Sequence, residues 1–259
     1  MVTRDWREVK RKYWRVVEDI IKQSNIILNI LDARFYQETR NKLIEQKIRD
    51  YRKKVIFVLN KSDLVSMDYL EKAFDELNKV AITVPLSCRE RRGKVRLIKA
   101  ITQLVKKRPM TIGVVGYPNT GKSSVINYLA GKKSARTSPV AGFTRGMQWI
   151  KLSKNFKLID TPGVVPQEER KEEDLALKAS LTNIQDNENV ALKIISLLLE
   201  KKKKILEERY SIKPKSNPEG VLKQIAEKKK KLKKGGILDL ENTSRMIVND
   251  WQKGKLRYY

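Results

Sequence analysis

The segment TIGVVGYPNTGKSSVINYLAG, residues 111–131, decides the fold of this 259-residue chain. Its start, TIGVVG (111–116), is a short apolar run typical of a buried strand, and its end has apolar residues at helical spacing. Between them, GYPNTGKS (116–123) fits the phosphate-loop pattern GxxxxGK[ST] in the strand–loop–helix context that the pattern requires. We interpret the segment as a phosphate-binding loop. The alternative is a glycine-rich turn before a surface lysine.

Each residue type in this loop suits one part of a bound triphosphate. Gly116 and Gly121 let backbone N–H groups turn toward phosphate oxygens, Lys122 neutralises the β and γ groups, and the Ser123 hydroxyl ligates magnesium. The residues expected to bind phosphate are Gly116, Asn119, Thr120, Gly121, Lys122, Ser123, Ser124 and Gly163.

Two segments downstream of the loop supply the remaining groups for a magnesium-dependent phosphate site. DTPG (160–163) follows a predicted strand, so Asp160 is expected near the magnesium ion and Gly163 near the γ-phosphate. Thr144 offers a second hydroxyl for the metal, with Thr137 and Ser138 as nearby competitors. The residues expected to act in hydrolysis are Lys122, Thr144 and Gly163.

A base-binding pattern lies upstream of the phosphate loop, in NKSD (60–63). The Asp63 carboxylate can accept hydrogen bonds from both N1–H and the exocyclic amine of guanine, whereas adenine presents no such pair of donors. A polar helix cap is the alternative, since Ser and Asp are favoured there. Ser87 and Cys88 again follow a predicted strand, and Cys88 by itself is more often a small buried hydrophobe than a nucleophile. The residues expected to bind guanine are Asn60, Lys61, Asp63, Ser87 and Cys88.

The wider pattern predicts an α/β domain followed by a smaller all-α domain. Short apolar runs alternate with helix-compatible segments, as in a parallel sheet covered on both faces, at 26–32, 55–60, 81–87 and 111–116. Residues 146–153 and 156–163 predict an antiparallel hairpin at one edge. Helical spacing then continues through 170–183, 187–209, 218–233 and 239–252. We expect a nucleotide-binding domain over 1–165 and a helical, lysine-rich RNA-binding domain over 166–259.

The amino-acid composition excludes several kinds of catalytic and metal site and indicates which class of partner the chain binds. The chain has 57 Lys and Arg against 30 Asp and Glu, a net charge of +27, which favours phosphate backbones or anionic membranes as partners. Histidine is absent, so Ser–His and Cys–His catalytic pairs and imidazole metal sites are excluded. The single cysteine, Cys88, excludes an internal disulfide and indicates a reducing compartment, and no disulfide-linked partner is expected. Without an apolar run of membrane length, we expect a cytoplasmic protein with no membrane partner.

Two lysine runs are the expected RNA contacts in the helical domain. Both have too many lysines in succession to form a helix face that packs in a core. They consist of Lys201, Lys202, Lys203, Lys204, Lys228, Lys229, Lys230 and Lys231. A solvated helix face is the alternative to RNA binding. Trp251 leaves a similar choice open, between stacking on unpaired bases and a place in the core.

These motifs together resemble the guanine-nucleotide domain of translation-factor-type GTPases, in a rotated order. The usual arrangement has the phosphate loop first, whereas here the guanine motif at 60–63 precedes the phosphate loop at 116–123. The likeness sharpens to the YlqF/RbgA and YawG group of ribosome-assembly GTPases through LDARFYQETRN (31–41). Tyr36 and Ala141 depart from that group, which has proline at both places.

The resemblance implies a circularly permuted P-loop GTPase that binds GTP or GDP with magnesium and acts on the maturing large ribosomal subunit. Its partners are then ribosomal RNA and the ribosomal precursor particle. Val164 stands where many GTPases have the glutamine that orients the attacking water. Asn119 matches an asparagine that lets related enzymes use potassium, so slow turnover stimulated by potassium or a ribosomal particle is expected. The alternative function is an RNA-binding scaffold that senses GTP with little hydrolysis.

Overall fold

The computed structural model describes residues 6–117, 119–131, 148–152, 154–160, 187–215 and 217–256. The chain divides into two compact units, Met1–Glu169 and Arg170–Tyr259. Thr137, Ser138, Ala141, Thr144, Gly163 and Val164, together with the predicted helix 170–183, lie outside the described residues.

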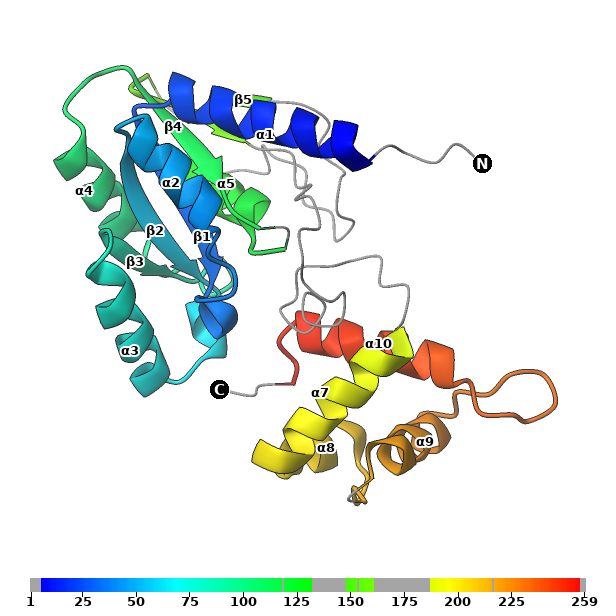
Figure 1. The fold of residues 1–259 in the computed structure, drawn as a ribbon. Helices are drawn as coiled ribbons and strands as arrows, with labels where there is room; N and C mark the ends of the chain where they lie inside the picture. Colours follow the sequence, from blue (N-terminus) through cyan, green and yellow to red (C-terminus); the bar gives the residue numbers. More distant parts are fainter. Residues whose placement is uncertain are drawn as a thin grey trace. The chain divides into compact units, whose positions relative to one another are not determined.

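A six-stranded sheet forms the centre of the first unit, with the strand order β3–β2–β1–β4–β6–β5 (Figure 1). Neighbouring strands are parallel except for β5, which pairs antiparallel with β6 at one edge. The strands are β1 (Ile26–Asp32), β2 (Lys54–Asn60), β3 (Thr83–Leu86), β4 (Met110–Val115), β5 (Gln148–Lys151) and β6 (Phe156–Asp160). The predicted parallel sheet with an antiparallel edge hairpin is therefore confirmed.

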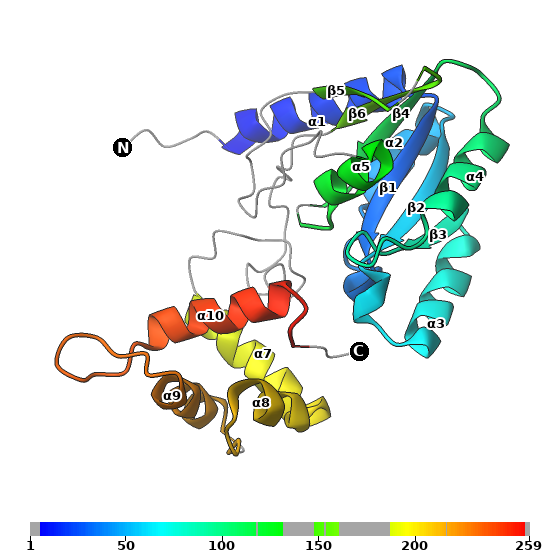
Figure 2. The same ribbon diagram turned by 180° about the vertical axis from the view of Figure 1, so that it is seen from behind.

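Helices cover both faces of this sheet because alternate residues of the buried strands point to opposite sides. In β1, Ile26, Leu28 and Ile30 join one apolar cluster, whereas Ile27 and Leu31 join clusters on the other face. Figures 1 and 2 show the two layers. The first face packs on α4 (Lys94–Leu104) and α5 (Lys122–Ala130), and the second on α1 (Trp6–Gln23), α2 (Lys42–Asp50) and α3 (Met67–Asn78).

The register of the parallel strands places several chemically active segments at one edge. Asp32 at the end of β1 is the partner of Asn60 at the end of β2, and Asn29 of β1 is the partner of Val115 at the end of β4. Since carboxyl ends of parallel strands share an edge, the guanine motif and the phosphate loop both begin there, on either side of the end of β1. The strand of the guanine motif comes first in the chain, which is the permuted order.

The second unit is helical and has its own apolar core. It contains α7 (Asn187–Lys201), α8 (Lys203–Tyr210), α9 (Pro218–Lys228) and α10 (Leu240–Gln252). Trp251 is 2% exposed, so it belongs to the core, and base stacking by this residue is excluded. The buried Asp250 carboxylate accepts hydrogen bonds from Arg209 Nη2 at 2.7 Å and Nε at 2.9 Å, which ties α10 to α8.

Two helix predictions in this unit were wrong in extent. The helix predicted over 187–209 is interrupted at Lys202, whose φ of −152° and ψ of 54° are not helical. The interruption lets Leu206 and Tyr210 of α8 enter the core, where both are fully buried. The helix predicted over 218–233 ends at Lys228, and the following backbone forms a bridge between Leu232 and Leu238. Tertiary packing and turn formation override helical spacing here.

None of the described helices combines the length and the apolar character that crossing a lipid bilayer requires.

Candidate functional site

The phosphate loop leaves β4 in a backbone conformation that its residue types permit. Gly116, Asn119 and Gly121 have φ values of 143°, 59° and 96°, in the left-handed region that glycine and asparagine tolerate best. A Cβ atom at Gly116 would overlap the carbonyl oxygen of Ile30 in β1, and one at Gly121 would overlap the side-chain amide of Asn60. The glycines therefore allow the loop to lie directly against the ends of β1 and β2.

The lysine of the loop is held inside it. Lys122 is 7% exposed, and its Nζ donates hydrogen bonds to the carbonyl oxygens of Gly116 and Tyr117, each at 2.9 Å. Thr120 Oγ1 also donates to the Tyr117 carbonyl, at 2.8 Å. A buried ammonium at the start of α5 adds a full positive charge to the partial charge of the helix N-terminus. This end of the site thus suits a polyanion.

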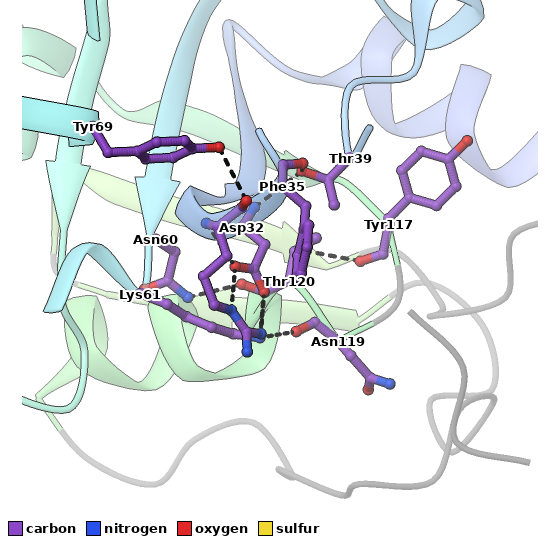
Figure 3. Close-up of polar contacts among 10 residues, drawn as sticks. Asp32, Phe35, Thr39, Asn60, Lys61, Tyr69, Tyr117, Asn119 and Thr120 are labelled. Carbon is purple, nitrogen blue, oxygen red and sulfur yellow. Dashed lines mark hydrogen bonds and ion pairs between the residues drawn. The ribbon is translucent and has the colours of Figure 1, made fainter. Parts of the chain in front are cut away.

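The guanine motif is bonded to the phosphate loop. Asn60 Nδ2 donates to the carbonyl oxygen of Thr120 at 2.8 Å, and Lys61 Nζ donates to the carbonyl oxygen of Asn119 at 2.6 Å (Figure 3). Lys61 has a φ of 62°, which turns the chain sharply after β2. Segments 58 residues or more apart in sequence therefore meet in one site.

Asp63, the last residue of the guanine motif, is oriented by the loop after β3. Ser87 Oγ donates a hydrogen bond to Asp63 Oδ1 at 2.7 Å and accepts one from the backbone N–H of Glu90 at 3.0 Å. Burial, together with the charge of Asp63, raises the pKa of the Cys88 thiol to about 12. Cys88 also packs against the apolar cluster beneath α4, so it is a hydrophobic residue beside the guanine motif and not a thiolate.

Asp32 was missed as a site residue by the sequence analysis, although it lies at the centre of the polar contacts in Figure 3. Its carboxylate is 1% exposed and accepts hydrogen bonds from Lys61 Nζ at 2.7 Å and from Arg34 Nη2 at 2.7 Å and Nε at 3.0 Å. Burial opposes ionisation of this carboxyl, but Lys61 and Arg34 outweigh it and hold the pKa of Asp32 well below its usual range. The signal was the Asp-Ala-Arg element at the end of the first apolar run.

Two of the three expected magnesium ligands, Ser123 and Asp160, lie among the residues that the structure describes, and their binding of magnesium stays a prediction. Ser123 lies in the first turn of α5, and its hydroxyl makes no hydrogen bond to another described residue. The β6 strand ends at Asp160, whose partner Val114 in β4 precedes the phosphate loop. A hydroxyl and a strand-end carboxylate are hard oxygen donors, which is what magnesium prefers. No cluster of three or more acidic or Cys residues is present in the described part of the chain.

The expected RNA-binding lysines are on the surface of the helical unit wherever their side chains are described. Lys202, Lys203, Lys204, Lys228, Lys229 and Lys230 are exposed, and Lys231 is half-buried. The first run straddles the interruption between α7 and α8, and the second lies at the C-terminal end of α9. Cations at a helix C-terminus are favoured by the helix dipole. Their role in binding RNA stays a prediction.

The chain is similar to known GTPases over most of its length. The family model described as RsgA GTPase matches residues 7–168, and the one described as 50S ribosome-binding GTPase matches residues 111–234. The GTP-binding protein MJ1464 of Methanocaldococcus jannaschii is 42% identical over 100% of this chain and 70% of its own length. Nuclear/nucleolar GTPase 2 of Arabidopsis thaliana is 34% identical over 96% of this chain, which spans only 44% of that relative.

The fold is also shared with a solved structure. The crystal structure of GNP-bound YlqF from T. maritima superposes with a TM-score of 0.62 over 94% of both chains, at 24% sequence identity. At that identity the likeness concerns the fold.

Proposed function

We propose that this chain, which belongs to the RsgA GTPase family of circularly permuted ribosome-assembly GTPases, hydrolyses GTP as a switch in the assembly of the large ribosomal subunit. In this proposal the GTP form binds ribosomal RNA or a precursor particle, and hydrolysis releases it. The membership rests on the family match and on MJ1464, whereas the substrate, the partner and the switching cycle are inferences from the chemistry of the site.

One observation carries the nucleotide part of the proposal. The Asn60 amide and the Lys61 ammonium are bonded to consecutive carbonyls of the phosphate loop, at Thr120 and Asn119. A base held near Asp63 and phosphates held by the loop are therefore parts of one ligand. Since Asp63 offers two carboxylate oxygens, that ligand presents two adjacent donors, as guanine does.

The protein groups have separate tasks in hydrolysis. Lys122 and the N–H groups at the start of α5 stabilise the negative charge of the transferring phosphoryl group. Ser123, Asp160 and Thr144 are the proposed holders of magnesium, which supplies charge neutralisation between the β- and γ-phosphates when bound. Gly163 is proposed to contact the γ-phosphate, so that the segment around it responds to hydrolysis.

Slow intrinsic turnover follows from Val164, because a hydrocarbon side chain cannot polarise water. A monovalent cation beside Asn119 would stabilise developing charge as an arginine finger does, an effect on the order of 10³–10⁵ in rate for the finger. We therefore propose stimulation by potassium or by a ribosomal particle. Equal rates in sodium and potassium, with and without particles, would contradict this part.

Nucleotide choice is tested with the variant Asp63→Asn. Replacing one acceptor oxygen with an amide donor should shift the preference from guanosine toward xanthosine nucleotides, measured by competition against a fluorescent GDP. Asp68→Asn, an exposed carboxylate early in α3, is the matched control and should keep the guanosine preference. An unchanged preference in Asp63→Asn would remove this residue from the base site.

The switch is tested by cosedimentation with large-subunit precursor particles in GDP and in a non-hydrolysable GTP analogue. Binding favoured by the analogue, together with phosphate release accelerated by particles, is expected. Nucleotide-dependent binding without phosphate release would instead establish the second candidate, a scaffold that senses GTP. The presence of Val164 in place of the water-orienting glutamine favours this candidate.

A further inference from the structure

The region around α4 of the first unit is strongly basic, and the nucleotide site leaves this charge unused. Residues 89–108 contain nine basic residues and a single acidic one, Glu90. All of the basic side chains except Lys94 are exposed. Lys94 is occupied, because its Nζ donates to the carbonyl oxygens of Tyr128 and Leu129 at 2.9 Å each. We call the exposed basic residues of 89–108 the α4 basic surface.

Most of this charge is not neutralised within the molecule. Glu90 forms an ion pair with Arg92, and both side chains are exposed, where such a pair stabilises little. Arg89, Lys99, Lys106 and Lys107 form no side-chain hydrogen bond or ion pair with any other described residue. Clustered cations without counter-charges repel one another, so the surface is favoured by a polyanionic partner.

The helices α3 and α4, which follow one another in the chain, differ sharply in charge. The helix α3, whose apolar residues pack on the other face of the sheet, has four acidic residues and one lysine in MDYLEKAFDELN. The helix α4 has no acidic residue in KVRLIKAITQL. A uniformly high net charge would not separate the two helices in this way. The α4 side is therefore a face on which almost no acidic residue offsets the basic ones, which suits a phosphate-rich partner.

From this distribution we propose that the α4 basic surface is an RNA-docking surface of the first unit, separate from the lysine runs of the helical unit. Five of the nine basic residues are arginines, whose guanidinium forks match phosphate oxygens bidentately. The helix spans about 16 Å at 1.5 Å per residue, with basic loops at both ends, so several phosphates can be contacted together. RNA is favoured over a membrane because Leu97 and Ile101 of α4 are buried in the core. The exposed apolar residues of the helix, Val95 and Ile98, each stand next to a basic residue in the sequence and form no continuous apolar face.

The surface adjoins the loop that orients Asp63. Ser87 and Arg92 exchange backbone hydrogen bonds, from Ser87 N to Arg92 O at 3.1 Å and from Arg92 N to Ser87 O at 3.0 Å. The hydroxyl of the same Ser87 donates to Asp63. A partner bound at Arg89–Arg92 is thus connected to Asp63 of the proposed guanine site through Ser87, which contacts both Arg92 and Asp63.

The inference rests on the proposed function in taking RNA as the partner, and the experiment separates the two. The α4 variant replaces Arg89, Lys99, Lys106 and Lys107 with Gln in the full chain. The control variant makes the same charge change at Arg11, Lys42, Arg49 and Lys54, which are exposed around α1, α2 and β2. Binding to large-subunit ribosomal RNA is measured across a salt series, with GDP affinity and thermal unfolding recorded for each protein.

If four phosphate contacts are lost, the slope of log affinity against log salt should be smaller by about 3 in the α4 variant, at roughly 0.7–0.9 per contact. The control variant should keep nearly the slope of the original chain, and GDP affinity should be unchanged in both. Equal slopes in the two variants overturn the docking surface while leaving the proposed function intact. Absence of RNA binding by the unsubstituted chain overturns both. Loss of binding to phosphatidylserine vesicles, with RNA binding retained, would show a membrane surface instead.

Discussion

Asp32 is the single residue on which most polar contacts between β1, β2 and the phosphate loop depend. Its carboxylate neutralises Lys61, which in turn bonds to the Asn119 carbonyl of the phosphate loop. Asp32 thus acts on the nucleotide site through Lys61, as a positioning residue. Breaking a buried ion pair on one side leaves the other charge without compensation, which is the costly case.

We therefore predict that Asp32→Asn lowers the free energy of unfolding at pH 7 by about 3–5 kcal/mol. Because the pKa of Asp32 is depressed in the folded state, its stabilisation is complete above the unfolded pKa of about 3.9 and is lost as pH falls below it. Urea unfolding at pH 7 and pH 3 should show the difference between variant and original chain shrinking by about 1 kcal/mol at pH 3. Asp50→Asn, an exposed control, should show no such change; a constant difference for Asp32→Asn contradicts the ion pair.

A second prediction at this scale compares two glycines with positive φ. Gly116→Ala places a Cβ against the backbone carbonyl of Ile30, which cannot move without distorting β1. Gly131→Ala has a φ of 71° but meets nothing within 4 Å, so only the backbone strain of about 1 kcal/mol applies. Denaturant unfolding should show a clearly larger loss for Gly116→Ala, together with loss of GTP binding. Equal losses would mean that the loop does not lie tightly on β1.

At the scale of elements, the β3–α4 connection links the α4 basic surface to the guanine motif. RNA bound at Arg89–Arg92 should hold the loop in the conformation in which Ser87 bonds to Asp63. We predict that saturating ribosomal RNA slows GDP release by at least several-fold, since coupling between sites is typically about 1–3 kcal/mol. Stopped-flow displacement of a fluorescent GDP measures this rate. The four-residue α4 variant should lose the effect, whereas an unchanged rate in the original chain would contradict the coupling.

The elements differ in how far they could be predicted from their residues. β1 and β4 were predicted to within one residue because buried parallel strands give continuous apolar runs bounded by polar turns. The ends of α7 and α9 were not predictable, because each lies at a lysine run, and a lysine run is equally compatible with a helix or a turn. At the end of α7 the choice depends on where Leu206 and Tyr210 pack. Asp32 was missed for a similar reason: its partner Lys61 is distant in sequence, and only the register of β1 with β2 brings them together.

At the scale of the whole molecule, we predict that the two units respond differently to nucleotide, because the proposed binding site belongs to the first unit. A ligand at 100 times its dissociation constant adds about 2.7 kcal/mol to the stability of whatever binds it. Hydrogen exchange should therefore slow in the amides of β1, β2 and β4 when GTP is added, with little change in α9 and α10. Equal protection of both groups would show that the units unfold together.

The central position of β1 in the sheet has a consequence for biosynthesis. Its partner β2 follows it closely in the chain, but its other partner, β4, begins only at Met110. While the polypeptide is being translated, one edge of a strand that is wholly buried in the final fold therefore stays unpaired for some eighty further residues, and such edges promote aggregation. A nascent chain of this permuted GTPase is thus a natural client for chaperones until the phosphate-loop strand has emerged.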